Sequence, residues 1–293
     1  MQQNIDMLPA DKRRQLQTQL WEKSVRRTWE KSAFYRGKFD RAGLSLPELT
    51  DLSNLSRLPF TTAAELAAAA PLDCLTGPLS TTIRVRRCAG ALRAFTAGDV
   101  GRAAERTARA LAAGGVNLAS VLLLCGAADE QSAAVQYAGE VLGATVVPDV
   151  RAADAPGLVQ QLGVDFVAGR ADELAALFRH APALCQENAL SGIFFWEDAP
   201  QGAMPPQSGA PLLELFGPPQ LGCASTLYAC GESEGLHVCE EDFYAEITGG
   251  ELVLTSLTLE AMPFVRYRTG LRVKALAGPC PCGRTTLRVL RAD

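Results

Sequence analysis

The sequence predicts an α/β protein: a largely parallel sheet flanked by helices, followed by a smaller β-rich region. Three observations support this fold class. Apolar strand-like runs alternate with helical segments in the middle of the chain, short strands crowd its last part, and 48% of the 293 residues are hydrophobic, enough for a large core. We expect an N-terminal helical segment at 1–80, a sheet-and-helix lobe at 81–200 and a β-rich lobe at 201–293.

The first part of the chain predicts helices. One helix is predicted over residues 8–42, where Leu16, Leu20, Val25 and Trp29 recur at spacings of four to five and form one apolar stripe. Basic side chains lie mostly off this stripe, as on a solvated face; the alternative is a face for a membrane surface or an acidic partner. A turn at 58–62 ends in a helix N-cap, and a helix is predicted at 63–70.

The middle of the chain, 101–198, predicts a parallel sheet. Val121–Leu124 is an uninterrupted apolar run, as in a strand that is buried on both faces. Helices at 101–113, 128–142, 154–162 and 171–179 alternate with strands at Val121–Leu124, Thr145–Val147, Val164–Val167 and Ile193–Trp196. This rhythm places helices on both faces of the sheet.

The last part predicts a mostly antiparallel β region. Its strands are expected at Leu212–Phe216, Ser225–Ala229, Phe243–Ile247, Glu251–Ser256, Phe264–Arg268 and Leu271–Ala275. Gly249 and Gly250 separate two of these strands as a hairpin turn.

Composition excludes several classes of function. The net charge of −4 argues against a nucleic-acid partner, since a duplex binder is usually basic. The sequence begins without a basic, then apolar, signal peptide, and its apolar runs are too short to cross a bilayer, so we expect a cytoplasmic protein with no membrane partner. Nine cysteines in a reducing compartment favour metal binding over disulfides.

One segment resembles a known family. The run from Gly250 to Gly270, which reads GELVLTSLTLEAMPFVRYRTG, is similar to a stretch of the phenylacetate–CoA ligases and coenzyme F390 synthetase-like proteins. Shorter matches occur in the family's order: Ser32–Arg36, Leu58–Thr61, Leu142–Pro148 and Cys280–Thr285. The likeness spans the whole chain, with deletions.

The resemblance implies a fold and a chemistry. The fold is the large N-terminal domain of an adenylate-forming enzyme. Such enzymes activate a carboxylic acid with ATP and magnesium and then transfer the acyl group to coenzyme A. A small C-terminal domain that carries a catalytic lysine swings between the two half-reactions. Here Leu290–Asp293 resembles the start of the hinge to that domain, which predicts that the swinging domain is absent.

The residues that the resemblance assigns to the nucleotide depart from the family pattern. The phosphate loop, S-S-G-T-T-G in the family, corresponds to a shortened segment around Gly90 that follows the basic strand at 83–87. The Y-G-x-T-E motif, which supplies a ring for adenine and a magnesium ligand, becomes Phe216 to Gln220, and an amide is a poor ligand for a hard cation. The aspartate for the ribose is replaced by Leu271. Gly90, Phe216 and Gln220 are therefore degenerate nucleotide positions or, alternatively, ordinary turn and core residues.

Four residues have the chemistry of a tetrahedral zinc site: Cys230, His237, Cys280 and Cys282. Three thiolates and one imidazole favour zinc over magnesium or calcium, and four protein ligands leave no position for water, which indicates a structural ion. Cys239, two residues from His237, could replace Cys230, because residues i and i+2 of a strand share a face. The alternative is three free thiols and a surface histidine. The other cysteines are predicted to be core residues.

These observations predict a ligase-like protein that has lost ATP-dependent adenylation and serves as a scaffold for a ligand or partner, with no catalytic residues of its own. An acyl or CoA-like small molecule, a partner protein and a homodimer are the expected partners. The alternative is an aryl– or phenylacetate–CoA ligase that a separate chain completes with the missing domain. A further site at His180 is not expected, because this residue near the end of a helix suits the helix dipole.

Overall fold

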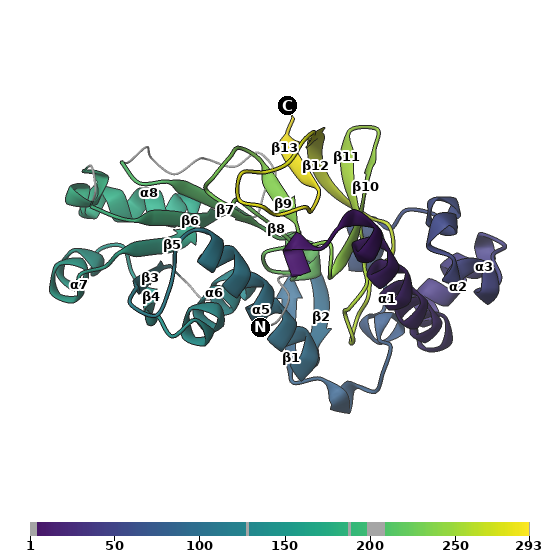
Figure 1. Cartoon of the computed structure of the whole chain (residues 1–293). Helices are drawn as coiled ribbons and strands as arrows, with labels where there is room; N and C mark the ends of the chain where they lie inside the picture. Colours follow the sequence, from purple (N-terminus) through teal and green to yellow (C-terminus); the bar gives the residue numbers. More distant parts are fainter. Residues whose placement is uncertain (1–4, 127–128, 187–188, 198–208, 293) are drawn as a thin grey trace. The chain divides into compact units, whose positions relative to one another are not determined.

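In the computed structural model, residues 5–126, 129–186, 189–197 and 209–292 are described (Figure 1). They form two units. The first unit comprises 1–101, 219–222 and 238–293, and the second comprises 102–218 and 223–237. The division into three parts at 1–80, 81–200 and 201–293, which the sequence suggests, remains a prediction.

The second unit is built on a mixed sheet, as the alternating sequence predicts. Its strand order is β8-β7-β6-β5-β3-β4. Neighbouring strands are parallel from β4 to β7, and β8 is antiparallel to β7. The bounds are Val121–Cys125 (β3), Thr145–Val150 (β4), Phe166–Arg170 (β5), Gly192–Trp196 (β6), Leu212–Phe216 (β7) and Leu227–Tyr228 (β8). The strand expected at Ser225–Ala229 is shorter because Ser225 has a positive φ of 48°.

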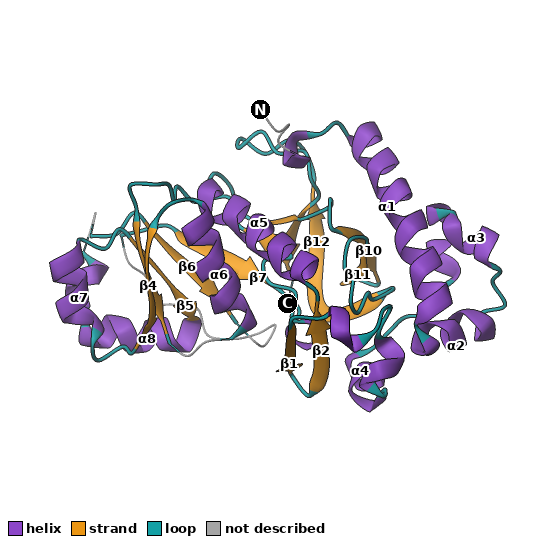
Figure 2. Ribbon diagram, turned by 90° about the horizontal axis from the view of Figure 1, so that it is seen from below, coloured by secondary structure: helices purple, strands orange, loops and turns teal. Residues whose placement is uncertain are grey.

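Helices cover both faces of this sheet (Figures 1 and 2). On one face, α7 (Ala155–Leu162) and α8 (Ala171–His180) bury apolar side chains against Leu123, Val167 and Ile193. On the other face, α5 (Ala97–Ala113) and α6 (Glu130–Val141) approach closely at glycines: Gly114 lies against Phe194, and Gly139 against Val146. Strands sandwiched in this way need apolar side chains on both sides, which explains the continuous apolar runs in the sequence.

The first unit begins with two helices where the sequence predicts one over 8–42. The structure has α1 (Ala10–Lys31) and α2 (Ala33–Arg41), so the prediction of a single helix is wrong. Ser32 separates them. Its backbone is extended, its hydroxyl accepts a hydrogen bond from Tyr35 N, and it donates one to the Asp73 carbonyl at 2.8 Å. A serine that caps the next helix in this way ends the preceding one.

The rest of the first unit's helical part consists of short segments. Its helices are α3 (Leu46–Thr50) and α4 (Ala63–Ala68), joined by 3₁₀ turns η2 (Leu52–Arg57), η3 (Pro71–Cys74) and η4 (Leu79–Thr81). A capping box of Thr62 and Glu65 starts α4, as expected from the turn that precedes it. Among the described residues, no helix is long and apolar enough to span a membrane.

The first unit also contains the predicted antiparallel β region. Its strands are β10 (Phe243–Thr248), β11 (Glu251–Ser256), β12 (Tyr267–Leu276) and β13 (Arg288–Arg291), each paired with the next. Gly249 and Gly250 make the expected two-residue turn, both with positive φ. The separate strands predicted at Phe264–Arg268 and Leu271–Ala275 are wrong: one strand, β12, runs through Gly270, whose φ of +75° lies at a register shift in the ladder.

A two-stranded hairpin in the first unit follows η4. β1 (Arg84–Cys88) corresponds to the basic strand expected at 83–87, but β2 (Ala91–Phe95) lies where the sequence predicts the shortened phosphate loop around Gly90. The two strands pair in register from Arg84 with Phe95 to Cys88 with Ala91. Only Ala89 and Gly90 lie between them, both with positive φ (42° and 94°), as in a type I′ turn.

Candidate functional site

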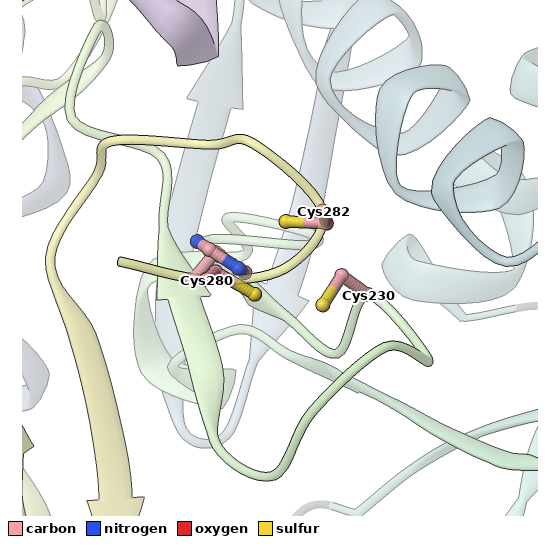
Figure 3. Close-up of side chains that lie close together, drawn as sticks. Cys230, Cys280 and Cys282 are labelled. Carbon is pink, nitrogen blue, oxygen red and sulfur yellow. The ribbon is translucent and has the colours of Figure 1, made fainter. Parts of the chain in front are cut away.

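Four potential metal ligands lie together. The ligand atoms of Cys230, His237, Cys280 and Cys282 are all within 4.8 Å of one another, and all but Cys282 are buried. Figure 3 shows the three labelled cysteines turned toward one another. This is the Cys₃His cluster that the sequence predicts, assembled from residues more than fifty positions apart.

A tight turn presents two of the cysteines. In the loop between β12 and β13, Gly283 N donates a hydrogen bond to the Cys280 carbonyl at 3.0 Å, which closes a four-residue turn over Pro281 and Cys282. Proline suits the second position of such a turn because its φ is already set. Gly278 and Gly283, both with positive φ, bend the chain on either side. The turn explains how two thiols only two residues apart can face the same point.

Cys230 and His237 come from the opposite ends of another loop. Cys230 follows β8, and the positive φ values of Gly231 and Gly235 return the chain to the short strand β9 (Leu236–Val238), in which His237 is central. His237 has no exposed surface, and its ring lies 5.9 Å from that of Tyr228. The cluster contains Cys230 and leaves out Cys239, because β9 ends at Val238 and Cys239 begins a turn.

The cluster fits zinc in its donor set and its size. Zinc–sulfur bonds of about 2.3 Å at tetrahedral angles separate two sulfurs by about 3.8 Å. The 4.8 Å that encloses these four ligand atoms is about 1 Å wider than that geometry, so small side-chain movements would suffice to bind the ion. Four protein ligands would complete the tetrahedral coordination of such an ion and leave no open position for a reacting water.

The turn that contains Gly90 offers little to a phosphate. Gly90 is exposed at the tip of the β1–β2 hairpin, and two residues are too few to form a loop. The N–H groups of a phosphate-binding loop converge on the ligand from several successive residues. Here the flanking residues Cys88 and Ala91 pair with each other across the ladder.

The other two predicted nucleotide residues are engaged inside their own units. Phe216, the last residue of β7, is 4% exposed. Gln220 lies in the 3₁₀ turn η6 (Pro219–Leu221), and its side-chain oxygen accepts a hydrogen bond from the Tyr267 hydroxyl at 3.0 Å. Leu271 is 1% exposed on β12, so an apolar core side chain occupies the position that the resemblance assigns to the ribose aspartate.

The segment 250–270 acts mainly as an internal brace. The Arg266 guanidinium pairs with Glu246 at 3.0 Å, donates to the Ser56 carbonyl at 2.8 Å and stacks over the Phe60 ring at 4.2 Å. Arg268 pairs with Glu251. Arg266 has a positive φ of 47°, a strained backbone that these contacts hold in place. Sequence reasoning identified this segment by its resemblance but did not reveal what its arginines contact.

Thr96 and Asp99 form the N-terminal cap of α5. Asp99 N donates to the Thr96 hydroxyl, and Thr96 N donates to an Asp99 carboxylate oxygen, both at 3.0 Å. The same carboxylate also accepts from the N–H groups of Glu260 and Ala261. The helix cap is therefore part of the brace around the 250–270 segment.

Comparison with known proteins gives relatives over nearly the whole chain. No family model matches it. The phenylacetate-coenzyme A ligase of Thermus thermophilus is 29% identical over 98% of this chain and 71% of its own length. The phenylacetate-coenzyme A ligase of Escherichia coli is 26% identical over 94% of this chain and 70% of its own length. The chain is thus shorter than these relatives.

Solved structures share the fold. A 2-hydroxyisobutyryl-CoA ligase, in complex with 2-HIB-AMP and CoA, matches 98% of this chain and 70% of its own with a TM-score of 0.83 and 21% identity. An open conformation of the same ligase gives a TM-score of 0.85 over 97% of this chain and 69% of its own, at 18% identity. The α/β fold is therefore that of an adenylate-forming ligase.

Proposed function

Because this chain is a homologue of phenylacetate–CoA ligases over most of its length, we propose that it is a ligase-like protein that does not form an acyl-adenylate by itself. In this proposal it keeps the fold as a scaffold for a small ligand or a partner protein. The proposal concerns the residues of this chain and does not depend on where the sequence ends.

The observation that carries the proposal is the two-residue turn at Ala89 and Gly90. The resemblance implies a six-residue loop rich in glycine, serine and threonine at this place. Adenylation builds negative charge on the transferred phosphate, and catalysis needs several N–H and hydroxyl donors preorganised around that charge. A type I′ turn has neither the hydroxyls nor enough free N–H groups.

Two more positions support the same conclusion. A carboxylate is the preferred ligand of magnesium, but Gln220 is neutral and already accepts a hydrogen bond from Tyr267. The buried Leu271 has no group that could bind a ribose hydroxyl. Each change removes a different contact to the nucleotide, so their effects on affinity and rate would combine.

We further propose that the Cys₃His cluster holds one structural zinc ion. When bound, the ion supplies a double positive charge that offsets most of the negative charge of the thiolates of Cys230, Cys280 and Cys282, groups that are expensive to bury alone. Its role in this proposal is to fix the backbone around its four ligands. Residues 280–283 already form a hydrogen-bonded turn that presents Cys280 and Cys282.

A second candidate function is the ligase activity named for the relatives, with a separate chain completing the enzyme. The observation that favours it is the complete brace around the 250–270 segment, including the ion pairs of Arg266 and Arg268. This segment stabilises the fold whether the protein is an active ligase or an inactive scaffold. It is therefore weaker support for ligase activity than the two-residue turn at Gly90 is evidence against it.

Pyrophosphate exchange tests the proposal directly. The whole zinc-loaded chain is incubated with ATP, Mg²⁺, phenylacetate and labelled pyrophosphate, with the E. coli relative as positive control. We expect no carboxylate-dependent exchange, and no thermal shift at millimolar ATP. Exchange by this chain alone would overturn the proposal.

The variant Gln220→Glu sharpens the assay. It restores the carboxylate but leaves the turn at Gly90 unchanged, so we expect it to remain inactive. Exchange that appears in Gln220→Glu would mean that the hairpin turn does not by itself prevent nucleotide binding, and the ligase interpretation would then lead.

A further inference from the structure

The outer edge of β1 carries backbone groups that the hairpin does not use. Among the described strands, β1 pairs only with β2, and Figure 2 shows the two strands side by side. Cys88 and Ala91 flank the two-residue turn and therefore form a hydrogen-bonded pair. Because such pairs alternate along an antiparallel ladder, the N–H and C=O groups of Val85 and Arg87 point away from β2.

A contact of β2 supports this alternation. Ala94, the cross-strand neighbour of Val85, donates its N–H to Met262 Sδ at 3.0 Å. The N–H of Ala94 therefore points away from β1, and Val85 and Ala94 exchange no hydrogen bonds. Within the part of the chain that the structure describes, no hydrogen bond involves the backbone of Val85 or Arg87. Unpaired groups of this kind are a template for an additional strand.

One face of the hairpin exposes apolar side chains beside this edge. Val85 and Leu92, 53% and 37% exposed, lie on the same face, because Leu92 is directly opposite Arg87, two residues from Val85. Leu72 and Leu79, 66% and 51% exposed, line a cavity of about 150 Å³ together with Val85 and Leu92. Exposed apolar side chains gathered around one hollow commonly mark an interaction surface.

Arg87 adds a positive charge to the same face. Its side chain is exposed, and among the described residues it forms no ion pair. The face is therefore apolar at Val85 and basic at Arg87. Opposite charges and apolar pairs stabilise neighbouring strands when they lie directly opposite each other. This edge fits a strand that carries an acidic and an apolar side chain two residues apart.

A second copy of the chain fits the edge poorly. If two β1 strands paired antiparallel around Val85, Arg84 of each copy would lie opposite Arg86 of the other. If they paired around Arg86, the two Arg86 side chains would face each other. Like charges directly opposite destabilise a sheet, and charged side chains commonly protect edge strands against self-association. The basic edge therefore favours an acidic partner over another copy.

We propose that β1 is a docking edge for an extended segment of a partner protein, which adds to the hairpin as an antiparallel third strand. The segment exchanges hydrogen bonds with the backbone of Val85 and Arg87. It places an acidic side chain opposite Arg87 and, two residues later, an apolar side chain opposite Val85, beside the cavity that Leu72 and Leu79 line. This inference gives the chemistry of a partner for the scaffold role proposed above and rests on that role.

NMR of the whole isotope-labelled chain with the capped peptide acetyl-TTETVTT-amide tests the docking edge. We expect saturable binding with a Kd below about 1 mM, with shifted amide signals and slower hydrogen exchange at Val85 and Arg87. The exchange of Arg84 and Arg86, whose amides face β2, should slow less. In the peptide TTETPTT, proline removes the N–H that Val85 would accept, so we expect binding at least about tenfold weaker.

A charge exchange tests the acidic position. The peptide TTKTVTT should bind the parent chain at least about fivefold more weakly than TTETVTT does. Arg87→Glu should weaken TTETVTT at least about fivefold and should bind TTKTVTT more tightly than the parent chain does. Arg26→Glu reverses a charge on an exposed part of α1 and should change neither affinity. If Arg87→Glu fails to fold, the three peptides with the parent chain still decide.

Several results would overturn the docking edge: no saturable shift up to about 2 mM TTETVTT, equal affinities for the three peptides, or shifts confined to other amides. Protection of Val85 and Arg87 that rises with protein concentration without peptide would show that a second copy occupies the edge, and would overturn the assignment to a partner protein. Pyrophosphate exchange by the chain would instead overturn the loss of adenylation and leave the peptide results intact.

Discussion

At the scale of single residues, Asp99 joins two segments that are far apart in the sequence. The side chain is 3% exposed, and its oxygens accept hydrogen bonds from Thr96 N, Glu260 N and Ala261 N at 3.0, 2.7 and 3.0 Å. Asp99→Ala would remove a helix cap and leave buried N–H groups without an acceptor. We expect it to lower the free energy of unfolding by about 3 kcal/mol, measured by urea denaturation.

Asp51→Ala is the matched control for Asp99→Ala. Asp51 also accepts a hydrogen bond from a backbone N–H near a helix start, that of Ser53 at 2.9 Å, but the contact is exposed to solvent. Water can replace the lost acceptor, so the loss should stay below about 1 kcal/mol. Similar losses of unfolding free energy in the two variants would mean that the burial of Asp99 adds nothing to stability.

At the scale of elements, local pattern predicted most of the helices and strands. The parallel strands were predictable because burial on both faces demands continuous apolar runs, as in Val121–Leu124. The cap of α5 was predictable from Thr96 and Asp99 alone, because a capping box is a local motif. The Cys₃His set was predictable because ligand chemistry needs no knowledge of the fold.

The elements that were missed depend on distant contacts. In β2, the sequence from Ala91 to Phe95 has weak strand propensity, and its buried Arg93 donates to the Met262 carbonyl, 169 residues away. Gly270 predicts a break between strands, but the ladder accepts it as an irregularity within β12.

The hairpin turn gives a prediction at this scale. Ala89 has a positive φ of 42°, which is unfavourable for a residue with a Cβ, and asparagine tolerates it better. We therefore expect Ala89→Asn to raise the free energy of unfolding by about 0.5–1 kcal/mol. Gly90→Ala should lower it by about 1 kcal/mol through backbone strain alone, since a Cβ there would meet no atom within 4 Å. Both changes in the free energy of unfolding are to be measured by urea denaturation. Changes of the same sign in the two variants would contradict a type I′ turn.

At the scale of the whole molecule, the chain shares the fold of its relatives but differs from the family pattern at the positions that the resemblance assigns to the nucleotide. The α/β architecture matches that of a solved adenylate-forming ligase with a TM-score of 0.83, although only 21% of the aligned residues are identical. In this chain, buried apolar residues form the core, and the ion pairs of Arg266 and Arg268 brace the 250–270 segment. Gly90, Gln220 and Leu271 lie at positions where the resemblance places the nucleotide, and in this chain Leu271 is part of the core.

The last prediction concerns zinc, because its removal should affect the stability of the molecule beyond the four ligands. We expect about one zinc per chain in protein purified without chelator. Cys282→Ser should lose the ion and lower the melting temperature by at least about 5 °C, since metal binding contributes directly to folding. Cys185→Ser is the matched control: Cys185 is also half-buried but lies outside the cluster. It should keep both zinc and stability. Equal zinc content and equal melting temperatures in the two variants would show that the four residues form only a buried cluster of thiols and an imidazole.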